Sequence, residues 1–171
     1  PVAAPLVQVG NGFQLNTGRI RDQWHTMTRS GKSPRLGSHM AEPYLEIHPD
    51  DASDLGIGTA ELVEIDSGGQ CNLLRALPTE RVDKGPLFAP MHWTRQRRAS
   101  GPVKAVVHTR VDPVSGQPAL KSGRVSARRF DAAWYAFIAS AQPVRKYGAY
   151  CAVARTATGW QAEVADARPL S

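Results

Sequence analysis

The residues best suited to binding chemistry are concentrated in one polar segment, Thr17–Leu36, with the sequence TGRIRDQWHTMTRSGKSPRL. Thr17-Gly18-Arg19 places a hydroxyl, a backbone free to approach a ligand and a planar cation side by side. Trp24-His25-Thr26 adds a flat apolar ring, an imidazole and another hydroxyl. This set suits a flat heterocycle with polar edges that carries phosphates. A strand end followed by a surface loop would use the same residue types, so the residues alone leave both interpretations open.

Positive charge is concentrated in the same segment. The chain has a formal net charge of +6, and the segment contributes +4 of it, from Arg19, Arg21, Arg29, Lys32 and Arg35 against Asp22. Smaller clusters follow, formed by Arg95, Arg97 and Arg98 and by Arg124, Arg128 and Arg129. Clustered cations favour an anionic partner such as phosphate groups or nucleic acid. A solvated basic face is the alternative.

The chain lacks the sequence patterns that are typical of metal sites and of catalytic nucleophiles. The histidines stand at positions 25, 39, 48, 92 and 108 without HxxxH spacing, and no CxxC is present, so we expect no metal site in this chain. No GxSxG occurs and neither cysteine has a basic neighbour, so we expect no catalytic nucleophile. Cys71 and Cys151 are expected to be buried free thiols in a reducing cytoplasm.

Short strands joined by turns are expected to position the polar segment. The 171 residues suit one domain, or one domain with an appendage, and 13 Pro with 15 Gly argue against long helices. Strands are predicted over 43–48, 87–91 and 104–111, with a hairpin over 60–66 and 71–77. A short helix is predicted over 49–56, where Asp50 and Asp51 serve the helix start and are not a catalytic pair.

The C-terminal part is expected to contain a helix and a hairpin. Phe130, Trp134, Phe137 and Ile138 recur at helical spacing, which predicts a helix over Ala127–Ala141. A hairpin is predicted over 147–155 and 160–164. With many short strands and two helices, a closed barrel is favoured over an open sheet. No apolar run approaches the ~18–20 residues of a membrane span, and the first residues resemble a piece of a longer chain more than a signal peptide.

Four runs occur in an order that resembles a known family: TGRIRDQWHTMTRSGKSPRL, EPYLEIHPDDA, LFAPMHW and VDPVSGQPALK. They are similar to the C-terminal domain of prokaryotic assimilatory nitrate reductase, in the molybdopterin oxidoreductase superfamily. The resemblance is strong over 9–125 and weaker to the end. It implies a mainly β fold, a double-psi β-barrel of the aspartate decarboxylase-like type with a few short helices. The barrel would span 1–125, and a C-terminal extension of helix and hairpin, 126–171, would pack on it.

The resemblance also implies which residues bind the cofactor. The cofactor residues carried over are Thr17, Gly18, Arg19, Arg21, Gln23, Trp24, His25, Thr26, His92 and Lys121, the last of which follows the DPVSGQP turn. Met91, His92 and Trp93 would lie near the substrate funnel. Two positions depart from the family pattern: Lys104 stands where an Asn is usual, and Ala119 stands where an acid is usual.

The implied function is to bind molybdopterin guanine dinucleotide in an enzyme that reduces nitrate to nitrite. The whole enzyme would carry Mo-bis(molybdopterin guanine dinucleotide) and an iron–sulfur cluster, with the metal-ligating cysteines in N-terminal domains. This chain would then contain no catalytic residue, and its partners would be the remaining domains, an electron donor and nitrate, with no nucleic acid and no membrane. Two alternatives remain: a small basic β-barrel that binds RNA or single-stranded DNA, and a protein–protein module.

Overall fold

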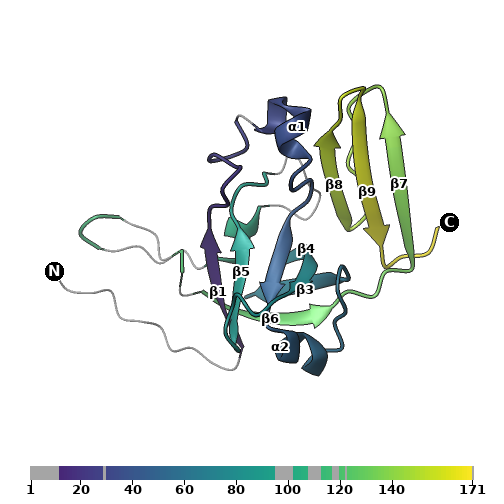
Figure 1. Ribbon diagram of the computed structural model, residues 1–171. Helices are drawn as coiled ribbons and strands as arrows, with labels where there is room; N and C mark the ends of the chain where they lie inside the picture. Colours follow the sequence, from purple (N-terminus) through teal and green to yellow (C-terminus); the bar gives the residue numbers. More distant parts are fainter. Residues whose placement is uncertain are drawn as a thin grey trace.

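The computed structural model describes residues 12–28, 30–94, 102–107, 113–116, 120–121 and 123–170. These residues form two β-sheets with a few short helical turns between the strands. The first sheet closes into a barrel, and the last three strands form a second sheet beside it (Figure 1). The predicted mainly β fold is therefore confirmed.

The barrel has six strands: β1 (Phe13–Gly18), β2 (Tyr44–Ile47), β3 (Leu62–Ser67), β4 (Gln70–Pro78), β5 (Pro86–Pro90) and β6 (Gly123–Arg129). Their order around the barrel is β1-β5-β2-β4-β3-β6. The pairs β1–β5 and β2–β4 are parallel, and the other neighbouring pairs are antiparallel. Closure leaves no free sheet edge. This closed barrel with short helices is the architecture expected of the double-psi type.

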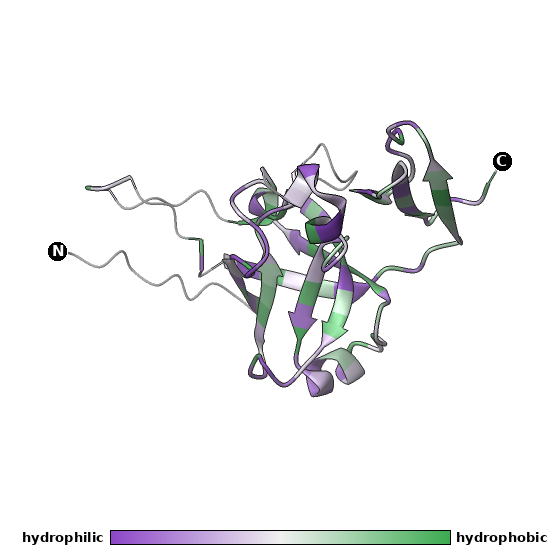
Figure 2. Ribbon diagram, turned by 45° about the horizontal axis from the view of Figure 1, so that its top comes forward, coloured by the Kyte–Doolittle hydropathy of each residue, from purple (hydrophilic) through white to green (hydrophobic). Residues whose placement is uncertain are grey.

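The barrel core is apolar and continuous, and it holds β1 firmly. In β1, Leu15 is fully buried, whereas its neighbours Gln14 and Asn16 are partly exposed, as the alternation of a strand requires. β2 lies between β4 and β5 and buries all four of its residues. Apolar colouring runs along the strands in Figure 2, and the connecting segments are more polar. The polar segment therefore begins at the end of an anchored strand.

Two local elements are found where turn and capping chemistry predicts them. The predicted hairpin is formed by β3 and β4, and the turn between them has positive φ at both Gly68 (61°) and Gly69 (84°). Helix α2 (Pro49–Asp54) has Pro49 in its first turn, and the amide of Asp50 donates to Nδ1 of His48. Asp50 and Asp51 lie in that first turn, which confirms their structural role.

Two predictions of local environment are wrong. Residues 103–106 form a 3₁₀ turn, η2 (Val103–Val106), and not the start of a strand. One such turn brings Val103 and Val106 onto the same side, where both are buried in the barrel core. Positions 108–111 lie outside the described residues. Cys71 is exposed next to the β3–β4 turn, where its thiol donates to Asp66, whereas Cys151 is buried as predicted.

The helix predicted over 127–141 is also wrong. This region contains the end of β6 and the strand β7 (Trp134–Ser140), which pairs with β9 (Trp160–Asp166) along its whole length. The spacing did not distinguish a helix from a strand, because Trp134 and Ile138 are four residues apart and therefore lie on the same face in either structure. Phe137 points to the opposite face and is 80% exposed.

The second sheet packs against the barrel through its strand β8 (Tyr150–Arg155). The strand order is β7-β9-β8, with β8 nearest the barrel and β7 outermost (Figure 1). The predicted C-terminal hairpin is formed by β8 and β9. A shared apolar cluster joins the two sheets: Leu62, Leu73, Tyr150, Ala152 and Ala165. The expected boundary at 125/126 falls within β6, which runs from the barrel toward this second sheet. No described helix is long and apolar enough to cross a membrane.

Because 134–140 form a strand, alanine substitutions at the adjacent residues Phe137 and Ile138 should change the stability of the protein by different amounts. Phe137→Ala should change the free energy of unfolding by less than ~0.5 kcal/mol, because the ring is exposed. Ile138→Ala should cost about 1–2 kcal/mol, because its side chain packs on the apolar cluster of the second sheet. Urea denaturation measures both values, and equal losses would favour a helix over this region.

Candidate functional site

The polar segment folds as two layers beyond the end of β1. The first, residues 18–28, is called the polar loop here. The second, residues 30–42, is called the return limb, and it contains the 3₁₀ turn η1 (Ser30–Lys32) and helix α1 (Pro34–Gly37) before β2 begins. Arg29, between them, lies outside the described residues. The two layers bring most of the predicted site residues to one end of the barrel.

Three predicted binding residues gather at the tip of the polar loop. The guanidinium carbon of Arg19 lies 5.1 Å from the ring centroid of Trp24. The rings of Trp24 and His25 meet edge to face, with their centroids 4.6 Å apart. Trp24 is 47% exposed, so one cation and two flat rings are presented together to solvent.

His92 lies beneath the polar loop and holds it from below. Its ring is fully buried. Nε2 accepts from the amide of Ile20 at 3.0 Å, and Nδ1 lies 2.6 Å from the carbonyl of His25, to which it donates. Burial lowers the pKa of His92, which keeps the ring neutral and able to make both bonds. Both ring nitrogens thus serve the loop backbone, and neither is directed to a ligand.

The backbone of the polar loop is strained at two positions. His25 and Met27 have positive φ values of 44° and 62°, in the left-handed region that costs a residue other than glycine about 1 kcal/mol or more. Met27 is buried, and its amide donates to the carbonyl of Trp24. Burial of Met27 and the His92 bond therefore maintain a conformation that presents Trp24 and His25 outward.

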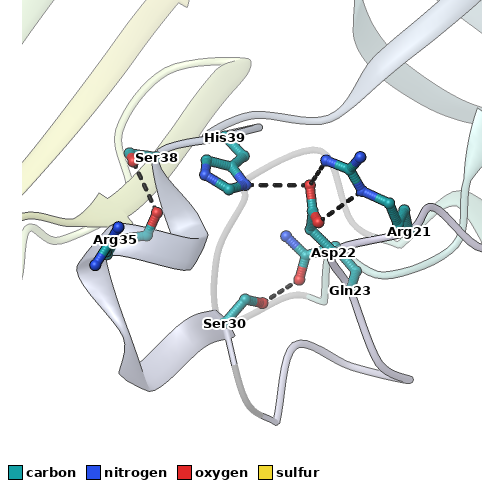
Figure 3. A network of polar contacts seen from close by, with 7 residues as sticks. All are labelled: Arg21, Asp22, Gln23, Ser30, Arg35, Ser38 and His39. Carbon is teal, nitrogen blue, oxygen red and sulfur yellow. Dashed lines mark hydrogen bonds and ion pairs between the residues drawn. The ribbon is translucent and has the colours of Figure 1, made fainter.

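Polar contacts join the loop to the return limb (Figure 3). Asp22 accepts from Arg21 at 3.0 Å and lies 3.2 Å from Nδ1 of His39. The bond from Arg21 lowers the pKa of Asp22, so the carboxylate stays ionised. Gln23 is buried, and its Oε1 accepts from the hydroxyl of Ser30. Its Nε2 is buried and has no protein partner within the part of the chain that the structure describes.

The end of β1 shapes the floor of the site. Thr17 is buried and its hydroxyl donates to the carbonyl of Leu120 at 2.8 Å, which brings the neighbouring Lys121, whose side chain is exposed, close to β1. A Cβ on Gly18 would lie 2.8 Å from the ring of Phe88. Gly18 is therefore required by its packing on Phe88, while its carbonyl accepts from the amide of Met91.

Two hollows border the polar loop. One, of about 560 Å³, is polar and includes Arg19, Arg21, His39, Glu46 and Arg81 in its lining. The other, of about 600 Å³, lies where Thr26 meets Met91, Trp93 and Lys104. The indole nitrogen of Trp93 is buried without a protein partner among the described residues. Thr26 and Lys104 are thus part of the site surroundings, although Arg95, Arg97 and Arg98 lie outside the described residues.

The sequence interpretation missed residues that shape the site. Ser30 bonds to Gln23, Phe88 packs on Gly18 and His39 contacts Asp22, but none of the three was assigned to the cofactor. Asp22 entered only as a negative charge within a basic segment. The single available signal was the alternation of β5, which puts Phe88 on the outer face of the barrel. The other contacts join positions that sequence spacing does not relate.

The donor set suits an anionic, heterocyclic ligand. Arg19 and Lys121 are cations without a described carboxylate partner, and Gln23 keeps one buried amide group unpaired. Trp24 offers a flat exposed face beside Arg19. A buried donor without a partner is costly in a protein alone, and a bound acceptor would relieve that cost. The residues present therefore fit a phosphorylated pterin.

The buried ring of His92 predicts a pH effect on stability. Its folded pKa lies below the ordinary value of about 6.5, so the unfolded chain takes up the proton first as the pH falls. The contribution of neutral His92 to the free energy of unfolding should be complete above about pH 6.5 and should decline as the pH falls below it. Denaturation of the wild type and of His92→Gln at pH 7 and pH 5 measures this, and equal pH slopes in the two proteins would contradict it.

Comparison with known proteins agrees with the geometry. The family described as "Molydopterin dinucleotide binding domain" matches residues 13–124. A nitrate reductase of Klebsiella oxytoca is 40% identical over 130 residues, which cover 76% of this chain and 15% of that protein. An F420-dependent formate dehydrogenase subunit alpha of Methanocaldococcus jannaschii is 33% identical over 117 residues, 68% of this chain and 17% of that protein.

A solved structure shares the fold. The acetylene hydratase of Pelobacter acetylenicus superposes with a TM-score of 0.57 at 16% identity, over 70% of this chain and 18% of that one. The chain thus spans less than a fifth of the length of the relatives it matches. Since the family match covers barrel strands β1 to β5 and the polar loop, the chain belongs to the molybdopterin dinucleotide-binding domain family, among relatives that include nitrate reductases and formate dehydrogenases.

Proposed function

We propose that this chain is the molybdopterin guanine dinucleotide-binding domain of a molybdenum-dependent nitrate reductase that works in nitrate assimilation. The observation that carries the proposal is the cluster of Arg19, Trp24 and His25 at the end of β1, within the region that the family matches. The 40% identity to a nitrate reductase supports nitrate as the substrate.

The residues of this chain would bind and orient the cofactor. Arg19 and Lys121 would neutralise phosphate groups, and the unpaired amide of Gln23 would donate to a polar edge. Trp24 would cover one flat face. The remaining residues assigned to the cofactor, Thr17, Gly18, Arg21, His25, Thr26 and His92, would shape or hold the loop that presents these groups. When bound, the cofactor supplies oxygen-atom and electron transfer, while the protein supplies binding, orientation and charge.

The rest of the enzyme would complete the site. We propose that the partners are other domains with the molybdenum-ligating cysteine and an iron–sulfur cluster, together with an electron donor, in the cytoplasm. The relatives are several times longer than this chain, which leaves room for such domains. The barrel would then act as a cover that closes over the dinucleotide.

A formate dehydrogenase is the second candidate for the parent enzyme. Its support is the 33% identity to a formate dehydrogenase subunit over 68% of this chain. In both candidate enzymes the polar loop would bind the cofactor. Assays of the full-length parent with nitrate plus a reduced dye, and with formate plus an oxidised dye, distinguish them.

Removal of the Arg19 cation should weaken cofactor retention in the full-length parent enzyme. Loss of one charge-assisted contact to a phosphate corresponds to roughly tenfold weaker binding. Molybdenum and guanine nucleotide per polypeptide, measured on purified Arg19→Ala, should therefore fall. Arg168→Ala is the control, because Arg168 lies at the end of the second sheet and bonds to Asp166. Full cofactor content in Arg19→Ala would refute the role of Arg19.

The chain alone should show no nitrate reduction with an artificial electron donor. The reason is that the molybdenum ligand and the iron–sulfur cluster are proposed to belong to other domains. Nitrite formation by the purified 171-residue chain, above a heat-inactivated sample, would overturn this assignment.

A further inference from the structure

The second sheet, β7 to β9, lies outside the region that the family matches. The match ends at residue 124, and the sheet begins at Trp134. None of the predicted cofactor residues belongs to it. Its strand β8 nevertheless reaches the return limb at two separate places, and both contacts involve residues beside the proposed site.

The first contact is a partly buried polar cluster between β8 and the end of the return limb. The hydroxyl of Tyr150 donates to the carboxylate of Glu42 at 2.5 Å. The same carboxylate accepts from Nε of Arg75 at 3.2 Å, and Arg75 also pairs with Glu163 on β9. Tyr150 is fully buried. Burial raises the pKa of Tyr150, so the hydroxyl keeps the proton that it donates.

The second contact lies at the other end of β8. Residues of the β8–β9 turn region, Arg155 and Thr156, face Pro34 and Gly37 of α1 across a small hollow of about 290 Å³. Figure 1 shows α1 beside the end of β8. The return limb is therefore held at α1 and again at Glu42, about the length of one strand apart.

The return limb is in turn bonded to the polar loop. His39 lies three residues before Glu42, and its Nδ1 is 3.2 Å from the Asp22 carboxylate, which also binds Arg21 (Figure 3). Ser30, at the start of the limb, donates to Gln23. The route thus runs from Tyr150 to Glu42 by a hydrogen bond, along three residues of backbone from Glu42 to His39, and from His39 to Asp22 and Arg21 by polar contacts.

We propose that the second sheet positions the polar loop, with Tyr150 as a positioning residue that acts through Glu42, His39 and Asp22. The consequence for cofactor orientation rests on the proposed function. A sheet that only enlarged the core would need apolar contacts alone, such as those of Leu62, Leu73 and Ala165. The partly buried cluster of hydroxyl, carboxylate and guanidinium adds directional bonds, which specify one placement of the limb.

Hydrogen exchange followed by mass spectrometry tests the proposal on the chain as it is. Tyr150→Phe keeps the ring in the apolar cluster and removes the bond to Glu42. Amide exchange in residues 30–42 and 18–28 should become about tenfold faster, the effect of losing one hydrogen bond to a charged group. Exchange in helix α2, which carries none of the residues of these clusters, should stay unchanged. Tyr135→Phe is the matched control, because Tyr135 lies on the same sheet and is 53% exposed.

A second variant tests the route through the return limb. In a His39→Ala background, Tyr150→Phe should still speed exchange in residues 30–42 but should add little in residues 18–28, because the His39–Asp22 bond on the proposed route is already lost. No change in either segment, or the same change throughout the barrel, would overturn the proposal. These readouts need no cofactor, so they can fail while the proposed function stands. Conversely, full cofactor content in the Arg19→Ala parent would refute the role of Arg19 in the proposed function and would leave the positioning role of Tyr150 untouched.

Discussion

The neutral, buried imidazole of His92 is the interaction on which the site depends. Its Nε2 accepts a hydrogen bond from the backbone amide of Ile20, and its Nδ1 donates one to the backbone carbonyl of His25. The polar loop has almost no apolar side chains to bury, so it cannot hold its shape by the hydrophobic effect. Two hydrogen bonds to a rigid ring in the barrel wall, with the burial of Met27, provide the constraint instead. This explains how a surface loop can keep two residues at positive φ.

Some cations of the site form ion pairs within the protein, and others remain able to bind a ligand. Arg21 and His39 are used to hold Asp22, so they contribute to the link between loop and return limb. Arg19 is stacked on Trp24 and has no described carboxylate beside it. A dense basic segment thus contains both structural and free cations, and net charge by itself does not separate them. The separation matters because only unpaired cations can neutralise a phosphate without breaking an existing bond.

The second sheet also supports the site, through the return limb. The barrel alone provides β1, β5 and His92 beneath the loop, but the outer layer of the site, residues 30–42, packs on β8. Glu42 joins residues from β4, β8 and, through Arg75, β9. Because these elements lie far apart in the chain, the shape of the loop depends on the packing of the whole domain. The polar cluster costs desolvation energy, which the mutual pairing of its members offsets.

The sequence by itself determined the features that depend on neighbouring residues. Glycines with positive φ specified the β3–β4 turn, and Pro49 with two acids specified α2, whereas the residues of the polar segment by themselves left a ligand site and a surface loop open as alternatives. Tertiary structure alone decided that His92 supports the loop, that His39 meets Asp22, that Cys71 is exposed and that 134–140 form a strand. The physical reason is that each of these features depends on pairing or burial against residues distant in the chain, as Ile138 does on Ala162, and local spacing contains no record of such contacts.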